Sequence, residues 1–431
     1  MSAALDFPPD FVWGAATSAF QIEGATDIDG RGESIWDRFC TVPGAIADGS
    51  DGRVACDHYR RYREDVDLIA SLGFNAYRFS IAWPRVIPTG TGEVNAKGLD
   101  FYDRLVDALL EKGIAPYATL YHWDLPQALE DQGGWRNRDT AQSFADYTRA
   151  TVERLGDRVT SWATLNEPYC AAVLGHQTGE HAPGIKSLKA TFAAAHHLLL
   201  AHGLAIPVIR DHAPQADAGI VLNFTPAYPA SDSEEDKKAT ATKDGFDNRW
   251  YVEPIAGKGY PEDTVTAMGW DQREIQPGDL DTIAAPIDFL GVNYYTRQVI
   301  SADGPVAPTL PLTDMGWEIH PEGLHDTLTI LHESHNFKKL LITENGAAMP
   351  DQPNDNGVVD DQDRIDYFKR HLEQVQRARQ DGVPVQGYFS WSLMDNFEWA
   401  FGYAKRFGIV RVHFDTLART PKASALWLRD M

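Results

Sequence analysis

The sequence predicts an α/β fold: a single (β/α)8 barrel of the TIM type, with long loops after several strands. Short apolar, β-branched or aromatic runs alternate along the chain with amphipathic segments, which is the pattern of parallel strands joined by crossover helices. These runs number about eight, the count that closes a barrel, whereas an open doubly wound sheet usually has about five to seven strands. The 431 residues are 43% hydrophobic, so they can bury the core of such a barrel.

The expected strands are spread over the whole chain, so we expect residues 1–431 to form one catalytic domain. They begin near Phe11, Asn75, Ala115, Ser161, Ala218, Asp288, Lys339 and Val385.

Helices are expected between these runs. The segments 57–73, 101–113 and 364–375 carry apolar residues at helical spacing. Gly73 and Gly113 end the first two segments, where a glycine commonly terminates a helix.

Two longer insertions interrupt this alternation. One lies around Ser231, and the other runs from Arg297 to Pro321. Both follow predicted strands, so we expect both to rise on the face where barrel active sites form.

The charge balance argues against several classes of partner. Thirty-nine Lys and Arg against 62 Asp and Glu give a net charge of −23, which repels nucleic acid and anionic lipid. The N-terminal segment carries an acid where a signal peptide has a basic start. No stretch elsewhere approaches the roughly 20 apolar residues needed to span a bilayer, so no membrane association is expected.

The cysteines and histidines predict neither disulfides nor a metal. Cys40, Cys56 and Cys170 form no C-x-x-C pair, which argues against a disulfide framework and a zinc knuckle and favours a reducing cytoplasm. The histidine-rich segment 196–202 contains no H-E-x-x-H motif and no acids at ligand spacing. We therefore expect no metal and no cofactor.

Two glutamates lie at the ends of predicted strands, where TIM barrels carry their catalytic residues. Glu167 closes the fourth run in TLNEP, and Glu344 closes the seventh in LITENG. Strands four and seven lie roughly opposite each other, so the two side chains should converge over the barrel mouth. Hydrolysis of an acetal needs a proton for the leaving oxygen and a partner for an oxocarbenium-like centre, and two carboxyl groups supply both. The alternative is that each is a solvated or capping acid.

From FVWGAATSAFQIEGA at Phe11 to SWSLMDNFEWAFGYAKRFGIV at Val410, the chain resembles the family 1 glycoside hydrolases, the β-glucosidase family. The resemblance implies that Glu167 is the acid/base and Glu344 the nucleophile of a double displacement that retains the anomeric configuration. For that route the two carboxyl groups should lie about 5 to 5.5 Å apart.

The resemblance also implies roles for other residues. Arg78 would pair with the nucleophile and Tyr295 would hydrogen-bond it, while Asn166 would contact the 2-hydroxyl, where contacts strengthen in the transition state. The further substrate contacts that it implies are Gln21, His122, Trp123, Asn293, Trp391, Glu398 and Trp399, with Cys170, His181, Asn223 and Trp317 at the outer subsites.

The implied activity is a β-glucosidase that removes terminal β-D-glucosyl residues from oligosaccharides such as cellobiose and from aryl or alkyl glucosides. Side activity on β-galactosides or β-fucosides is expected, and a role in cellulose degradation would follow. Relatives that act on 6-phosphoglycosides replace the acid at Glu398 and add basic groups, whereas Lys405 is the only basic residue between Asn396 and Lys405. The acid at Glu167 points to O-glycosides, because the thioglucosidase members lack it.

Three alternatives remain open at this point: a 6-phospho-β-glycosidase, a carbohydrate-binding protein on a degenerate barrel, and a metal-dependent barrel hydrolase. The sequence also leaves open the aglycone, the preferred chain length, the glucose versus galactose or fucose preference, product inhibition and the oligomeric state, a homo-oligomer included.

Overall fold

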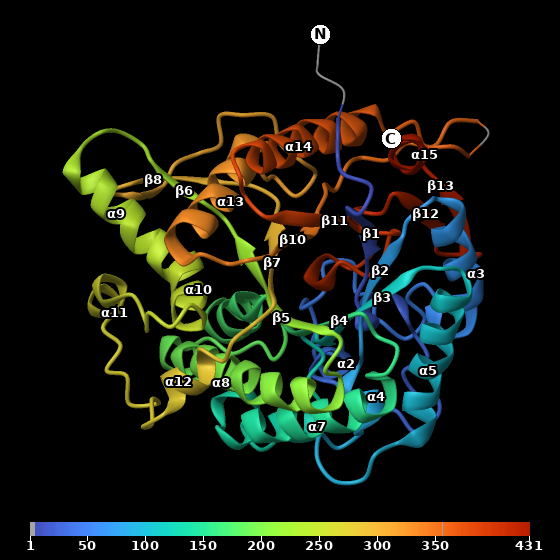
Figure 1. Ribbon diagram of the computed structural model, residues 1–431, viewed down its shortest axis with the longest axis horizontal. Coiled ribbons are helices and arrows are strands. Elements are labelled where there is room, and N and C mark those ends of the chain that lie inside the picture. Colours follow the sequence, from blue (N-terminus) through green and yellow to red (C-terminus); the bar gives the residue numbers. More distant parts are fainter. Residues whose placement is uncertain (1–4, 356) are drawn as a thin grey trace.

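Eight parallel strands close into a barrel in the computed structural model, which describes residues 5–355 and 357–431. The strands are β1 (Val12–Ala16), β2 (Ala76–Ser80), β3 (Ala115–Tyr121), β4 (Ser161–Asn166), β5 (Asp217–Phe224), β7 (Phe289–Tyr294), β10 (Leu340–Asn345) and β11 (Val385–Trp391). Neighbours around the barrel follow sequence order, and β11 pairs with β1 to close it; Figure 1 shows the ring at the centre of the molecule. The predicted barrel and its strand positions are confirmed.

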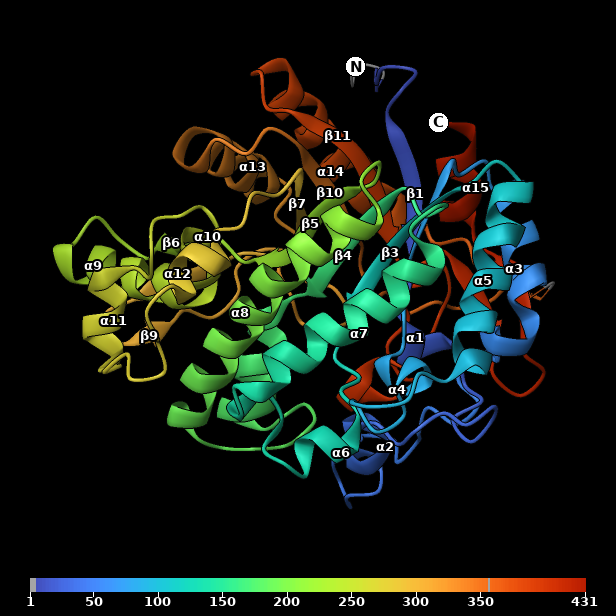
Figure 2. The same ribbon diagram turned by 60° about the horizontal axis from the view of Figure 1, so that its bottom comes forward.

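Long helices surround the barrel (Figures 1 and 2). They are α3 (His58–Ser71), α5 (Ala96–Glu111), α7 (Asp139–Leu155), α8 (Leu188–His212), α13 (Glu322–His335) and α14 (Gln362–Gln380). The three predicted helices correspond to α3, α5 and α14. Gly73 and Gly113 have φ of +74° and +71°, a conformation that glycine adopts without steric cost, so both end their helices as expected.

Shorter elements complete the loops. The helices are α1 (Ala19–Ile22), α2 (Ile35–Phe39), α4 (Trp83–Val86), α6 (Gln127–Glu130), α9 (Glu234–Asp244), α10 (Trp250–Ile255), α11 (Glu262–Met268), α12 (Asp279–Ile283) and α15 (Ala423–Asp430), with 3-10 turns at Gly134–Arg136 and Trp399–Phe401 and π-helices at Cys170–Thr178 and Gly245–Arg249. The strands outside the barrel are β6 (Ala227–Pro229), β8 (Gln298–Ser301), β9 (Gly304–Pro305), β12 (Val410–His413) and β13 (Ala418–Pro421).

The two predicted insertions lie together at one side of the barrel. The first provides α9 and the π-helix Gly245–Arg249, and the second provides β8 and β9. Strand β8 joins β9 and β6, which directly precedes the first insertion, in a three-stranded sheet. Figure 2 shows these elements projecting to the left of the barrel.

Helix α8 contradicts one expectation from the sequence. It has 25 residues, and its most apolar 18-residue window has a mean hydropathy of 1.6, so it is long and apolar enough to cross a membrane by length and composition alone. However, 89% of its most apolar window is buried inside the protein, against α7, β4 and β5 among other elements. The apolar character of α8 is therefore explained by burial on both of its faces.

A layer of small and large side chains fills the barrel. Ala76, Ala163, Phe289 and Phe389 belong to this buried cluster, together with side chains from the other barrel strands. Gly14 makes room for the Phe389 ring, because a Cβ at Gly14 would lie 2.2 Å from its Cδ1 atom. Since the interior is packed, a ligand must bind above it, at the carboxyl ends of the strands.

Candidate active site

The two glutamates singled out from the sequence face one cavity at the carboxyl ends of the barrel strands. Glu167 directly follows β4, Glu344 lies near the end of β10, and both line a cavity of about 470 Å³. Their side chains are largely buried, with relative exposures of 5% and 3%. The structure therefore brings together two carboxyl groups that are far apart in the sequence.

Glu344 has a cationic partner and a hydroxyl donor. Arg78 Nη1 lies 2.6 Å from Glu344 Oε1 and Tyr295 Oη donates to Oε2 at 2.7 Å. Burial raises the pKa of Glu344, and the Arg78 guanidinium and the Tyr295 hydroxyl oppose that rise. These contacts stabilise the ionised form of Glu344.

Glu167 has donors on both carboxyl oxygens but no ion-pair partner of its own among the described residues. Asn293 Nδ2 donates to Oε1 at 2.6 Å, and Cys170 Sγ donates to Oε2 at 3.1 Å. Burial raises the pKa of Glu167 to about 7, and the neighbouring charge of Glu344 adds to the rise. Because Arg78 pairs with Glu344 and not with Glu167, Glu344 ionises first and Glu167 keeps its proton up to about neutral pH.

Three site residues have left-handed backbone conformations that non-glycine residues rarely adopt. The φ angles are +46° at Glu167, +78° at Trp123 and +48° at Trp399. Each costs on the order of 1 to 3 kcal/mol, and such residues are concentrated at functional sites.

Asn166 links a hydrogen-bond partner of Glu344 to a hydrogen-bond partner of Glu167. Its Oδ1 accepts from Arg78 Nη2 at 2.7 Å and from Asn293 Nδ2 at 3.1 Å, so its Nδ2 is the atom that donates to His122 Nε2, 3.1 Å away. Burial lowers the pKa of His122 well below its usual value, and the charge of Arg78 lowers it further. His122 is therefore neutral, and its Nε2 is free to accept this hydrogen bond.

Glu398 lies at the inner end of the cavity beside Gln21. Gln21 Nε2 donates to Asn396 Oδ1 at 3.0 Å and lies 3.5 Å from Glu398 Oε2. Burial raises the pKa of Glu398 to about 8, and repulsion by Glu344 and then Glu167 contributes. Lys405 pairs with Asp314 at 3.2 Å. The inner end is therefore suited to neutral hydroxyl groups.

Aromatic side chains form much of the cavity wall. Trp391 stacks on His122 with ring centroids 5.8 Å apart, and Trp123 lies 4.6 Å from Trp399. Trp317 lies 5.5 Å from the ring of Tyr295, near the nucleophile candidate. Flat apolar surfaces beside polar groups suit a pyranose ring, which has C–H faces and an equatorial belt of hydroxyls.

All the predicted contact residues lie in or next to this cavity. Asn293, Trp317, Cys170, His181 and Asn223 line it, the last four of them expected at the outer subsites. Gln21, Arg78 and Asn166 contact it through Glu398, Glu344 and His122.

The insertions supply wall residues that the sequence reasoning missed. Lys243 Nζ lies 2.8 Å from Asp247 Oδ2, Gln298 Nε2 also donates to Asp247, and all three line the cavity mouth. The prediction that both insertions rise on the active face was the available signal. It did not identify these side chains, because their four-residue spacing is also common on solvated helices.

The histidines of the 196–202 segment have structural partners. His196 contacts Tyr260 and Asp279, His197 contacts the Trp135 carbonyl oxygen, and His202 contacts Thr164. These contacts give each imidazole a role within the core, on the outer side of the barrel strands.

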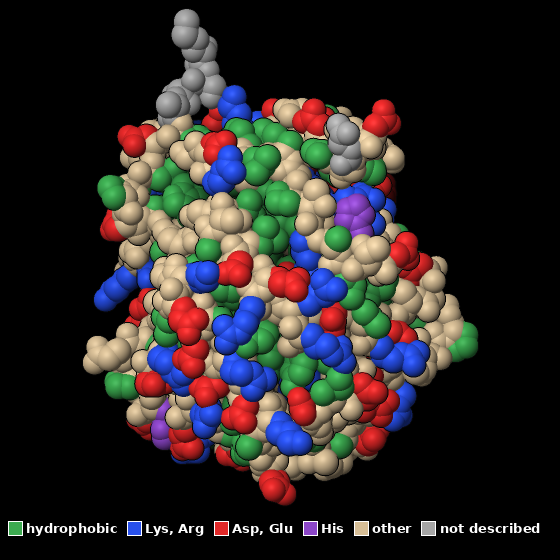
Figure 3. Space-filling view, turned by 90° about the vertical axis from the view of Figure 1, so that its right-hand side faces the viewer, with side chains coloured by type: hydrophobic (Ala, Val, Ile, Leu, Met, Phe, Trp, Pro, Cys, Tyr) green, Lys and Arg blue, Asp and Glu red, His purple; other side chains and the backbone are tan. Residues whose placement is uncertain are grey.

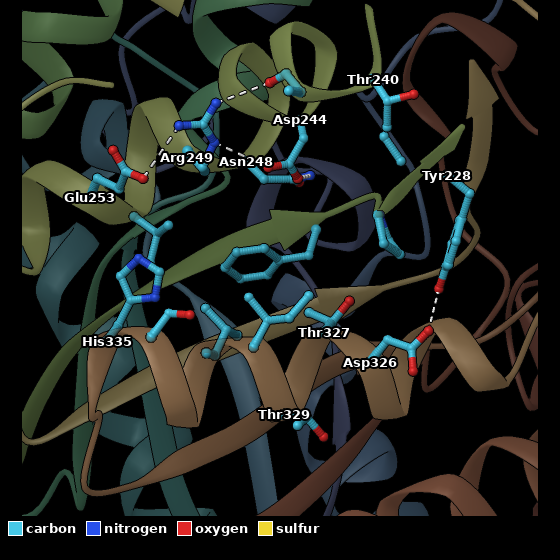
Figure 4. A pocket seen from close by; sticks show the side chains of 18 of the residues that line it. Tyr228, Thr240, Asp244, Asn248, Arg249, Glu253, Asp326, Thr327, Thr329 and His335 are labelled. Carbon is cyan, nitrogen blue, oxygen red and sulfur yellow. Dashed lines mark hydrogen bonds and ion pairs between the residues drawn. The ribbon is translucent and has the colours of Figure 1, made fainter. Parts of the chain in front are cut away.

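A larger cavity of about 750 Å³ lies between α13 and the elements β6, α9 and α10. Its charged groups largely pair with one another: Figure 4 shows Arg249 reaching Asp244 and Glu253, and Tyr228 Oη donating to Asp326 at 2.6 Å. Neither glutamate of the first cavity lines it, so the chemistry belongs to the smaller cavity.

Known proteins and a protein-family model match nearly the full length of this chain. The model of glycosyl hydrolase family 1 matches residues 3–431. Beta-glucosidase A of Acetivibrio thermocellus is 48% identical over 99% of this chain and 98% of that protein. A bifunctional beta-D-glucosidase/beta-D-fucosidase of Bifidobacterium breve is 44% identical over 98% and 97%. The structure of a family 1 β-glucosidase from Thermotoga maritima with isofagomine lactam has a TM-score of 0.96, at 47% identity over 99% and 98% of the two chains.

Proposed function

Because this chain belongs to glycosyl hydrolase family 1 and is a retaining β-glucosidase, we propose that Glu167 and Glu344 carry out its reaction. The observation that supports these roles best is the position of one guanidinium. Arg78 contacts the carboxylate of Glu344 and does not pair with Glu167, so two similar acids in one cavity have different proton affinities. A nucleophile must be ionised while its partner acid is protonated, and this asymmetry provides both states.

In the first step, a Glu344 carboxylate oxygen attacks the anomeric carbon and the bond to the leaving oxygen breaks. Glu167 transfers its proton to that oxygen, so the alcohol leaves neutral and Glu167 becomes a carboxylate. In the second step, Glu167 takes a proton from water, and the water oxygen displaces Glu344. Two inversions at one carbon give net retention.

The substitution Glu344→Gly tests the assignment of the nucleophile. It should lower kcat on an aryl β-glucoside by roughly 10⁴-fold or more, because a covalent intermediate can no longer form. Added azide should occupy the space of the missing carboxylate and yield an α-glucosyl azide. The matched substitution Glu167→Gly should instead yield the β-azide, because the nucleophile remains. The same anomer from both variants, read by NMR, would contradict the assignment.

The glycone is an unsubstituted sugar. The B. breve relative named for both glucosidase and fucosidase activity supports side activity on β-fucosides, and we expect the same tolerance towards β-galactosides. Glu398 contacts Gln21 rather than a cation that could bind a 6-phosphate, and Lys405 is paired with Asp314, which disfavours the 6-phosphoglycosidase alternative. Competition between a β-glucoside and its 6-phosphate in one assay tests this preference.

We propose short cello-oligosaccharides as substrates, because polar side chains line the outer part of the cavity. Asp247, Gln298 and Glu180 line the mouth and can bond the hydroxyls of a second glucosyl unit. We therefore place the protein in cellulose degradation, after the polymer has been cut into short chains. Turnover of aryl glucosides without turnover of cellobiose or cellotriose would count against this role.

A reducing location is proposed from the thiols. Cys40, Cys56 and Cys170 are all free, and two of them are buried, as is usual for proteins of the cytoplasm. Fractionation of the producing cells, with activity measured in each fraction, tests this location.

A further inference from the structure

Cys170 contacts the second carboxyl oxygen of Glu167, the proposed acid/base. Its Sγ lies 3.1 Å from Glu167 Oε2, and both side chains are buried. Asn293 holds the other oxygen, Oε1, at 2.6 Å. The Glu167 carboxyl is therefore held from two sides, by an amide and by a thiol.

The local backbone fixes this contact. Cys170 begins the π-helix Cys170–Thr178, and its amide N–H donates to the Glu167 carbonyl oxygen at 2.9 Å. Glu167 itself has a φ of +46°, which turns the chain sharply after β4. A π-helical turn at this point is a feature that often accompanies functional sites.

The thiol remains protonated over the working pH range. Burial raises the pKa of Cys170 well above its usual value, and the negative charge of Glu167 raises it further. An S–H group is a weak donor and its sulfur a weak acceptor. Cys170 can therefore donate to Oε2 when Glu167 is ionised and accept from Oε2 when Glu167 is protonated.

Asn293 determines which oxygen carries the proton. Its Nδ2 donates to Oε1, so Oε1 must act as an acceptor and the proton of Glu167 is held on Oε2. Other charged or titratable groups around Glu167 come from β2, β10 and the loops after β7 and β11. They are Arg78, Glu344, Tyr295 and Glu398.

The geometry points to Cys170 as a positioning residue that holds the proton-bearing oxygen of Glu167 and adjusts how readily that oxygen gives up its proton. This inference rests on the proposed role of Glu167 as acid/base. A weak, reversible partner suits a group that must be an acid in one step and a base in the next. A strong donor would stabilise the carboxylate and leave Glu167 without its proton near neutral pH, and an apolar neighbour would destabilise the carboxylate that must form in the first step.

Two substitutions at Cys170 should move the pH profile in opposite directions. Cys170→Ala removes the donor to the carboxylate, so the alkaline limb of kcat/KM should move up by about 0.5 pH unit. Cys170→Ser introduces a stronger donor, so the limb should stay in place or move down. Cys40→Ala removes a thiol outside the site and should leave the limb unmoved.

Leaving-group dependence gives a second readout. With Cys170→Ala, kcat/KM should fall several-fold for an alkyl glucoside, which needs the acid, and change less than about two-fold for a dinitrophenyl glucoside, which does not. The inference would be overturned if the alkaline limb of kcat/KM did not move in Cys170→Ala. It would also be overturned if this limb moved in the same direction in Cys170→Ala and Cys170→Ser. If the wild-type protein itself hydrolysed neither glucoside, the proposed function would be refuted instead.

A measurement on the wild-type protein covers the case in which a variant fails to fold. The infrared S–H stretching band of Cys170 should shift to lower frequency as the pH rises through the alkaline limb, because the thiol then donates to a carboxylate. The same band should not shift in Glu167→Gln. A band that is insensitive to pH in the wild-type protein would also overturn the inference.

Discussion

The Arg78 guanidinium distinguishes two carboxyl groups that burial alone would treat alike. It lies 2.6 Å from Glu344 and also holds Asn166 through its second nitrogen at 2.7 Å. Removing two acids from water is costly unless each is paired or neutral. Glu344 is paired, and Glu167, with its pKa raised to about 7, is neutral over much of the working range.

This difference predicts the pH dependence of the reaction. Because the raised pKa keeps Glu167 protonated below about pH 7, kcat/KM for an alkyl or cello-oligosaccharide substrate should fall as the pH rises through that value. A dinitrophenyl glucoside leaves without a proton, so its first step should lose little over the same range. Any small loss that remains with the dinitrophenyl glucoside should disappear in Glu167→Gln; a loss of the same size in that variant would assign it to another group.

At the scale of elements, packing inside the barrel sets how close the strands can approach. Gly14 on β1 faces the Phe389 ring of β11, and a Cβ at Gly14 would lie 2.2 Å from that ring. The two residues are also register partners in the barrel, so neither strand can move away without loss of the β1–β11 pairing. Phe389 belongs to the same buried cluster as Trp391, which lines the active-site cavity.

Gly14→Ala should therefore destabilise the protein by about 1 to 3 kcal/mol, the usual cost of overfilling a core. Urea unfolding measures the change. The double substitution Gly14→Ala with Phe389→Leu should lose less than the sum of the two single losses, because the smaller side chain makes room for the new methyl group. Strictly additive losses would show that the two side chains do not compete for space.

The elements were predictable where a local pattern reflects the fold. Buried parallel strands appear as short apolar runs, and barrel topology places Glu167 and Glu344 at the same face. The contact of Cys170 with Glu167 was not predictable, because it depends on a π-helix and a left-handed φ that the spacing does not reveal. The apolar sequence of α8 does not by itself distinguish a core helix from a membrane-spanning one.

At the scale of the whole molecule, surface and interior use charge differently. Figure 3 shows acidic and basic side chains interspersed over the face that carries α3 and α5. Arg154 on α7 pairs with Asp100 on α5 at 3.0 Å, and both side chains are 46% exposed. Pairs of this kind contribute little to stability, so the net charge of −23 is carried mainly by a solvated surface.

The interior contains a compact charge network that joins the C-terminal segment to the barrel loops. Lys422 lies 2.7 Å from Asp395 and also pairs with Asp351, and Asp351 lies 2.9 Å from Arg364. All four side chains are essentially buried, at 0% to 1% exposure. Asp395 directly precedes Asn396, the partner of Gln21, so the network also anchors the loop that carries Glu398.

Lys422→Met should destabilise the protein by about 3 to 5 kcal/mol, because it leaves two buried carboxylates with one cation fewer while keeping most of the side-chain volume. Arg154→Met is the matched control at the surface and should cost less than about 1 kcal/mol. Because Asp395 belongs to the glycone loop, the folded Lys422→Met protein should also show a raised KM for glucosides, whereas Arg154→Met should not. Equal stability losses in urea for the two variants would show that burial does not set the strength of this network, and an unchanged KM would separate it from the sugar-binding loop.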